Sequence, residues 1–164
     1  MVKSKFSLTY FKDERVVDIV NKADKKILAV WAIDCAERVL PYFEKKYPRD
    51  GRPRKAIQTL QEWIKTGVFK MSVIRGASLG SHAAAREVGE DSPARSAARA
   101  SGQAVATAHV KTHCMSSAIY AIQAVYRASE PSNAEAAIDK EKKWQYKRLL
   151  KLNVVNNWSK KQTI

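Results

Sequence analysis

Residues 92–129 read SPARSAARASGQAVATAHVKTHCMSSAIYAIQAVYRAS and form the longest helical pattern in the chain. Ser92 and Pro93 are typical of a helix N-cap and first helical residue. Small or apolar residues then recur every three or four positions, which places them on one side of a helix. We therefore expect a central, alanine-rich helix over residues 93–128. The pattern allows one helix or two, with a break near Gly102 or within residues 109–111.

The segments on either side of this stretch also have helical patterns. We expect helices over residues 12–22, from Asp24 to about 46, over 53–66 and over 69–88. Pro41 falls inside the second of these and should kink it or end it early. A further, basic helix is expected over residues 132–158. No segment has a convincing strand pattern, so the prediction is an all-α, single-domain bundle of about six or seven helices over residues 1–164.

Composition narrows the class of protein. A chain of 164 residues with 45% hydrophobic residues is long enough and apolar enough to bury a core. No apolar run is long enough to span a membrane, and charges interrupt the N-terminus before a signal-peptide core could form, so a cytoplasmic protein is expected. Cys35 and Cys114 both lie in helical patterns, and we interpret them as buried, reduced thiols.

The formal net charge of +14 indicates a possible anionic partner. Two regions are enriched in cations: residues 49–55, where a turn leads into a helix, and the last helix. One hypothesis is therefore a nucleic-acid-associated helical protein. Its candidate contact residues are Arg49, Arg52, Arg54, Lys55, Lys143, Lys147, Arg148 and Lys151. Cations at the start of a helix are unfavourable, so at least one of the first group should pair with Asp34, Glu37 or Asp50.

Histidines provide the candidates for chemistry. His109 and His113 are four residues apart, which would place both on one face of a continuous helix. A metal site would need His82 or Asp34 as further ligands. Structural hydrogen bonding and acid–base catalysis are the alternatives for these residues, and hydrogen bonding is favoured. No phosphate-binding glycine loop, Cys-x-x-Cys pair or dinucleotide fingerprint is present, so no cofactor is expected.

Three segments together resemble a known family. They are WAIDCAERVLPYFEKKYPRDGRPRKAI (31–57), SHAAAREV (81–88) and ARASGQAVATAHVKTHCMSSAIYAIQAV (98–125). They resemble the immunity protein five-like family of toxin–immunity systems, over about residues 24–128 and without the terminal helix. The resemblance implies an all-α domain that neutralises a cognate protein toxin by binding it. The polar positions that match the family pattern are Asp34, Glu37, Arg38, Arg52, Arg54, His82, His109 and His113.

Three functions follow in order of preference. The first is a non-catalytic immunity protein whose partner is a toxin. The second is the nucleic-acid-associated protein, and the third is a small metal-dependent hydrolase or nuclease-like enzyme built on Asp34, His82, His109 and His113. The sequence names no toxin and leaves the oligomeric state open. It also leaves open whether the polar residues line a pocket or form a buried network.

Overall fold

The computed structural model describes residue 6 and residues 13–161, and within them the side chains of residue 156 and residues 158–161 are not described. Every regular element in this part of the chain is a helix, as predicted. Its helices are α1 (Glu14–Lys22), α2 (Lys25–Lys46), α3 (Arg52–Thr66), α4 (Met71–Glu87), α5 (Pro93–Ala106), α6 (His113–Ala128) and α7 (Ala134–Lys161), with a 3-10 turn, η1 (Pro131–Asn133), before α7. No helix of the described residues is long and apolar enough to cross a membrane.

The central stretch forms two helices. α5 begins after the N-cap Ser92, whose hydroxyl accepts a hydrogen bond from the Arg95 amide, and it ends at Ala106. Turns occupy residues 107–109 and 111–112, and α6 starts at His113. The break therefore falls around residues 109–111, and the helix is continuous through Gly102.

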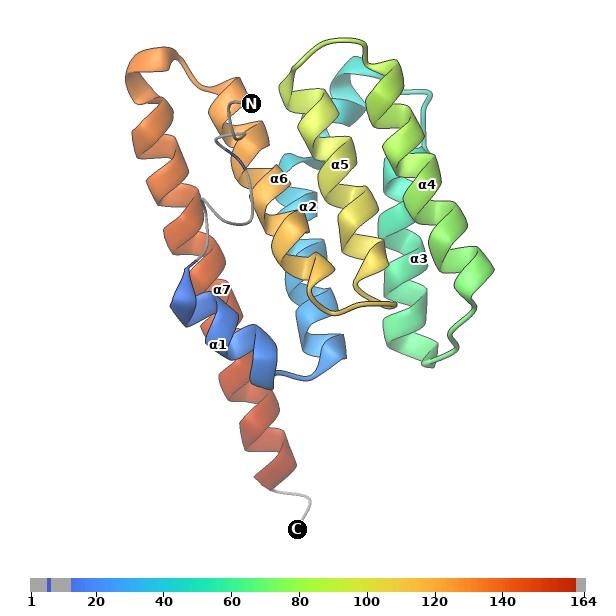
Figure 1. Ribbon diagram of the computed structural model, residues 1–164, viewed down its shortest axis with the longest axis vertical. Helices are drawn as coiled ribbons and strands as arrows, with labels where there is room; N and C mark the ends of the chain where they lie inside the picture. The colour runs from blue at the N-terminus through green and yellow to red at the C-terminus, as the bar shows by residue number, and fades with distance from the viewer. Residues whose placement is uncertain (1–5, 7–12, 162–164) are drawn as a thin grey trace, which may run out of the picture.

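α5 lies at the middle of the bundle. In Figure 1 it stands between α4 and α6, with α2 and α3 behind it, and it packs against all four. Its small side chains permit close approach, because hydroxyls on its neighbours reach its backbone directly. Ser81 donates to the Ala98 carbonyl (2.7 Å), Ser78 to the Gly102 carbonyl (2.9 Å) and Ser117 to the Ala100 carbonyl (3.0 Å). The alanine-rich sequence thus determines how tightly the bundle is packed.

α2 provides most of the large core side chains. Leu28, Trp31, Val39, Leu40 and Phe43 are all at most 1% exposed. The helix continues through Pro41 to Lys46, so the proline does not end it early. Pro41 is exposed, which leaves water free to solvate the Glu37 carbonyl that lacks its usual helical donor.

Three lysines stabilise one end of the bundle by donating to backbone carbonyls at or just beyond the C-terminal ends of helices. Lys26 donates to the Ile64 carbonyl of α3 (2.9 Å), and Lys111 to the Asn21 carbonyl of α1 (2.8 Å). Lys25 donates to the Ala108 and His109 carbonyls after α5 (3.3 and 3.4 Å). A cation there compensates the partial negative charge of the helix terminus.

Candidate functional site

A groove between α2 and α7 brings together residues from both predicted groups. It encloses about 660 Å³. Three of its residues belong to the polar positions of the family pattern, and three belong to the basic residues proposed for nucleic acid. The lining residues are Asp34, Glu37, Arg38, Trp144, Lys147, Arg148 and Lys151.

Two ion pairs cross this groove. Arg148 Nε donates to Asp34 Oδ2 at 2.7 Å, which gives this carboxylate of α2 an ion-pair partner. Arg38 donates to both oxygens of Glu141 at 2.9–3.1 Å, and its guanidinium lies 3.9 Å from the centre of the Trp144 ring. Both arginines are thus held by contacts within the chain.

Three other cations of α7 are unpaired within the described residues. Lys143, Lys147 and Lys151 are exposed and form no ion pair there. They are spaced four residues apart, so their Cα atoms follow one side of the helix at intervals of about 6 Å. The mouth of the groove therefore has unpaired lysines beside two carboxylates that already have partners. Asp34 is paired with Arg148, and Glu37 is paired with Arg54.

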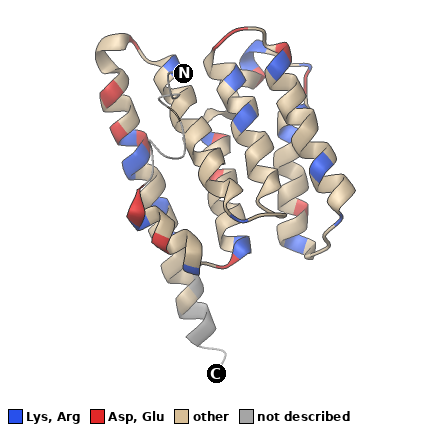
Figure 2. Cartoon of the chain, in the orientation of Figure 1, with Lys and Arg blue, Asp and Glu red and all other residues tan. Residues whose placement is uncertain are grey.

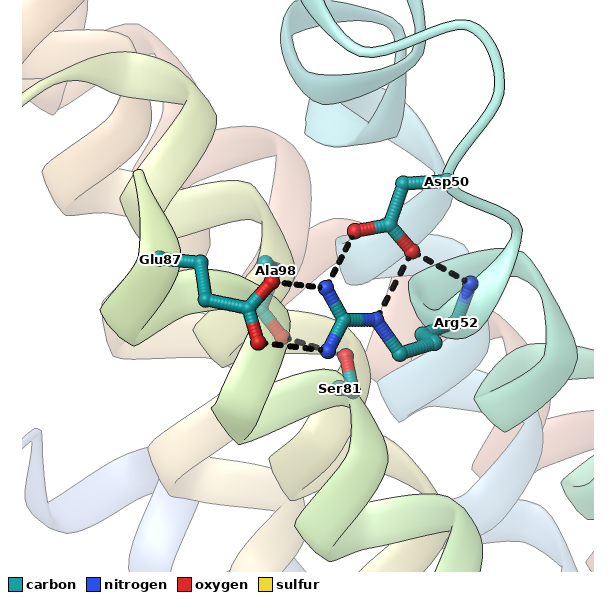
Figure 3. Close-up of polar contacts among 5 residues, drawn as sticks. All are labelled: Asp50, Arg52, Ser81, Glu87 and Ala98. Carbon is teal, nitrogen blue, oxygen red and sulfur yellow. Dashed lines mark hydrogen bonds and ion pairs between the residues drawn. The ribbon is translucent and has the colours of Figure 1, made fainter. Parts of the chain in front are cut away.

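The arginines near the tip of α3 are engaged in a second network (Figure 3). Arg52 lies between two carboxylates, at 2.6–2.9 Å from Asp50 and 2.5–2.9 Å from Glu87. These bonds hold the pKa of both carboxyls below their ordinary values. Arg54 donates to Glu44 (2.8 and 3.0 Å) and to Glu37 (3.0 Å). The expected pairing of these arginines with Asp50 and Glu37 is confirmed.

The remaining cations of residues 49–55 point to solvent. Arg49 and Lys55 are exposed and form no ion pair within the part of the chain that the structure describes. Arg49 lines a shallow depression with Lys46 and Tyr47, whereas Lys55 lines a groove between α3 and α4. The eight basic residues proposed for nucleic acid are therefore divided between two separate places, one near α3 and one on α7.

The histidine pair is not on one helix face, and that prediction was wrong. The chain breaks between the two residues, so His109 lies exposed in the turn and its ring stacks near Phe69 at 6.4 Å. His113 is the first residue of α6, and its Nδ1 lies 2.7 Å from Gln103 Oε1. A spacing of four places two residues on one face only while the helix continues between them.

His82 has a different environment, on α4 against α5. Its Nδ1 lies 3.2 Å from Arg99 Nη1, which makes Nδ1 the acceptor and puts the ring proton on Nε2. Burial lowers the His82 pKa to about 4, with further contributions from Arg99, Arg86 and His113. His82 is therefore a neutral hydrogen-bonding residue near neutral pH.

The four candidate metal ligands do not come together. Asp34 is bound to Arg148 in the α2–α7 groove, whereas His82 contacts α5 from α4. Among the described residues, no group of three or more histidine, cysteine, aspartate or glutamate side chains is arranged to hold a metal ion. These positions give no support to the metal-dependent hydrolase hypothesis.

Both cysteines are buried and free, as expected. Burial raises the pKa of Cys114 to about 12 and raises the pKa of Cys35 as well. Near neutral pH both groups are thiols, so neither is available as a nucleophile.

Sequence reasoning missed two polar residues that fix α7 in place. Glu141 and Gln145 are 3% and 4% exposed, on the same side of α7 as the buried Ile138 and Leu149. Gln145 donates to the Ala118 carbonyl (3.1 Å) and to Glu141 (3.2 Å). The signal was available, because polar residues at positions 141 and 145 continue the three-to-four-residue spacing of an apolar stripe.

Two glycines in neighbouring helices should respond oppositely to alanine. A Cβ at Gly76 would meet nothing within 4 Å, so Gly76→Ala should raise the unfolding free energy by about 0.5–1 kcal/mol through helix propensity. A Cβ at Gly102 would lie 2.9 Å from the His82 ring, so Gly102→Ala should lower it by about 1–2 kcal/mol. Urea denaturation measures both. Adding His82→Ala to Gly102→Ala should recover part of the lost stability, because the clashing ring is removed. If the losses in unfolding free energy of the two single variants simply add in the double variant, the proposed clash is contradicted.

Stability should fall at acidic pH, in part through His82. Its pKa of about 4 in the folded state lies below the ordinary 6.5, so the unfolded state binds more protons between these values. The contribution of His82 to the free energy of unfolding is therefore fully present above about pH 6.5 and is lost as the pH falls towards 4. Because the ring is only partly buried, we expect a contribution of about 1–2 kcal/mol rather than the full shift. Denaturation of wild type and His82→Asn at about pH 7.5 and 4.5 measures it; equal pH slopes would contradict the assignment.

The comparisons with known proteins give one family. The family model described as "Imm-5 like putative immunity protein" matches residues 18–152, and no curated protein or solved structure matches the chain. The match extends into α7, so the expectation that the terminal helix lies outside the family region was wrong. The physical reason is that α7 is part of the bundle, attached to α2 by Asp34–Arg148, Arg38–Glu141 and a hydrogen bond from Trp31 Nε1 to the Gln145 carbonyl at 2.9 Å. Because the match covers most of its length, the chain belongs to the Imm-5-like immunity protein family.

Proposed function

We propose that this protein is an immunity protein that neutralises a protein toxin by binding to it directly, without catalysis. Binding rather than catalysis is supported by the ion pairs that the charged residues matching the family pattern form within the chain. Asp34, Arg38, Arg52 and Arg54 each form an ion pair of 3.0 Å or less within the chain. Groups neutralised in this way stabilise the fold, and they are poorly placed to act on a substrate.

The chemistry of the partner follows from the remaining surface charge. After the internal pairs are formed, exposed cations such as Lys55, Lys143, Lys147 and Lys151 stay unpaired within the described residues. A net charge of +14 attracts an acidic protein surface and accelerates association with it. We therefore infer that the toxin presents an acidic face to this protein.

Coexpression tests the proposed function. Proteins encoded beside this chain's gene are expressed one at a time, and those that stop growth are expressed again with the immunity protein. The expected result is restored growth for at least one of them, together with a complex of the two purified proteins. Titration of the toxin's activity should reach full inhibition at an equimolar ratio. Protection at far lower ratios would indicate an enzyme, and no protection from any growth-inhibiting neighbour would refute the proposal.

Nucleic-acid binding is the second candidate, and the row of lysines on α7 is the observation that favours it. Lys143, Lys147 and Lys151 stand beside Trp144, which could stack on a base. Binding to single-stranded and duplex nucleic acid should then weaken steeply with salt. Replacing the three lysines with glutamine should reduce the salt slope by about 2–3, whereas the same change at the exposed Lys22, Lys45 and Lys65 should leave the slope nearly unchanged. Equal slopes in the two triple variants would leave the lysine row without a role.

A further inference from the structure

Exposed apolar side chains gather on and just before α4. Ten large apolar side chains are exposed among the described residues, and half of them fall within residues 68–79. They are Val68, Phe69, Met71, Val73 and Leu79, with exposures of 42–62%. Scattered exposed apolar residues are ordinary, but a contiguous group with a polar rim marks an interaction surface.

One member of this group, Val73, lines a groove between α3 and α4. The groove encloses about 580 Å³, and its walls include Lys55, Thr59, Val73, Gly76, Ala77 and Gly80. A Cβ built on Gly76 or Gly80 would meet nothing within 4 Å, so the outer side of α4 is low and open at both positions. We refer to Val73, Gly76 and Gly80, which line this groove, together with the exposed Leu79 beside them, as the α4 face.

Along α4 as far as Arg86 the charged residues have one sign, whereas on the α3 wall Arg52 is already paired with Asp50 and with Glu87, the last residue of α4. From residue 67 to residue 86 the sequence has three cations, Lys70, Arg75 and Arg86, and no acidic residue. Figure 2 accordingly shows blue and no red along the middle of α4. On the α3 side, Lys55 stands at the wall of the groove. Lys55, Lys70 and Arg75 form no ion pair within the described residues.

We propose that the α4 face is where this protein binds its toxin, and that it receives an amphipathic helix with an acidic rim. The apolar side of such a helix covers Val73 and Leu79 and enters the groove. The low surface at Gly76 and Gly80 allows its backbone to approach α4 closely. Its carboxylates meet Lys55 from α3 and Lys70 and Arg75 from α4. This inference depends on the proposed function for the identity of the partner, but its chemistry is testable without the toxin.

The same observations argue against two other occupants. A second copy of this chain would place an equally cationic face against the first, and like charges across an interface oppose binding. An anionic membrane matches the charge and the exposed apolar side chains, but a bilayer surface would leave the groove beside Gly76 and Gly80 unfilled. The α4 face is hollow, with glycine at two of its central positions.

The α2–α7 groove is a weaker candidate for the same partner. Asp34 and Glu37 line it, and Arg38 and Arg148 are already occupied by carboxylates. The groove of the α4 face, by contrast, has no carboxylate in its lining, and exposed apolar side chains and unpaired cations stand beside it. Apolar burial supplies most of the affinity of an interface, and the charges direct which partner binds.

The first test uses a designed helical peptide as the probe. It has about 18 residues, five helical turns, with leucine and alanine on one face and glutamate at its borders. Backbone amide shifts of the isotope-labelled full chain are followed during titration. Shift changes should concentrate in residues 68–86 and on the facing side of α3, and a peptide with lysine in place of glutamate should not bind. Changes centred on α7, changes spread over the whole basic surface, or no binding at millimolar peptide would each overturn the inference.

A matched pair of variants tests the site itself. Leu79→Glu should weaken peptide binding by about tenfold or more, because it replaces an apolar contact with a carboxylate that faces the peptide's own acids. Val154→Glu makes the same kind of change at a 63% exposed position of α7 and should leave binding unchanged. Both positions are exposed, so both variants should fold, which circular dichroism verifies. Equal binding by the two variants would overturn the inference, as would sedimentation of the wild type with anionic vesicles that Leu79→Glu abolishes.

Growth protection separates this inference from the proposed function. If the wild type protects against a toxin and Leu79→Glu does not, both are supported. If Leu79→Glu protects as well as the wild type, the protein is an immunity protein that uses another surface, and the inference is wrong. If the wild type protects against none, the proposed function fails, while the peptide titration still decides whether the α4 face binds acidic helices.

Discussion

Arg38→Met is expected to lower the free energy of unfolding by about 2–4 kcal/mol. The replacement leaves Glu141, whose side chain is 3% exposed, without the guanidinium that holds both of its oxygens. Breaking a buried pair from one side costs about 3–5 kcal/mol, and the 37% exposure of the Arg38 side chain reduces this because water can reach the gap. Chemical denaturation of the purified variant measures the loss.

Removing the other partner is the control for this prediction. Glu141→Gln keeps an acceptor for Arg38 and for Gln145, and it leaves the cation where water can solvate it, so it should cost less than Arg38→Met. The double variant, Arg38→Met with Glu141→Gln, should lose less free energy of unfolding than the two single losses added together. Equal losses in Arg38→Met and Glu141→Gln would contradict the view that the buried carboxylate, rather than the arginine, determines the penalty.

Trp31→Ala is expected to lower the free energy of unfolding by about 3–5 kcal/mol. The Trp31 side chain is 1% exposed in the core, and its indole nitrogen donates to the Gln145 carbonyl of α7 at 2.9 Å. Truncation therefore opens a cavity and removes a bond between two elements more than a hundred residues apart in sequence. Thermal and urea denaturation should agree on the size of the loss.

Trp144 is the matched comparison. It lies partly exposed on α7, packed on Arg38 rather than in the core. Trp144→Ala should cost about 1–2 kcal/mol, from partial apolar exposure and a lost cation–π contact. If Trp31→Ala does not fold, Trp31→Phe keeps most of the buried ring and should still lose more stability than Trp144→Ala. If Trp144→Ala lost more stability than Trp31→Phe, then α7 would be held mainly by its contacts in the α2–α7 groove and not by those of Trp31 in the core.

Several features of the site could be predicted from local pattern. The spacing of small residues indicated α5, and the unfavourable cations at the start of α3 indicated that at least one of them pairs with an acid such as Asp50. The partner of Asp34 could not be identified, since Arg148 is more than a hundred residues away and no local rule connects them. Arg52 shows the same limit. Asp50 is its neighbour in sequence, but Glu87 reaches it only because α4 packs beside α3.

The His109–His113 pair failed for a related reason. Helical spacing places two side chains together only if the helix is continuous. Residues 107–112 contain no proline or glycine, so the sequence did not decide between one helix and a break near Gly102 or within residues 109–111. The chain turns there because α5 must reverse direction for α6 to pack against it. A site predicted from helical spacing is therefore correct only if the helix boundaries are also correct.

The sequence by itself determined that this protein is an all-helical, strongly basic bundle around an alanine-rich segment, because periodicity, composition and net charge are local or additive properties. Family membership also follows from sequence, through the match over residues 18–152. Only the tertiary structure decided which charged side chains form ion pairs with one another and which remain unpaired within the described residues. Pairing of Arg38 with Glu141, or of Arg148 with Asp34, depends on how α7 lies against α2. So does the exposure of the α4 face, because a helix with a mixed surface is buried or open according to the neighbours that the fold gives it.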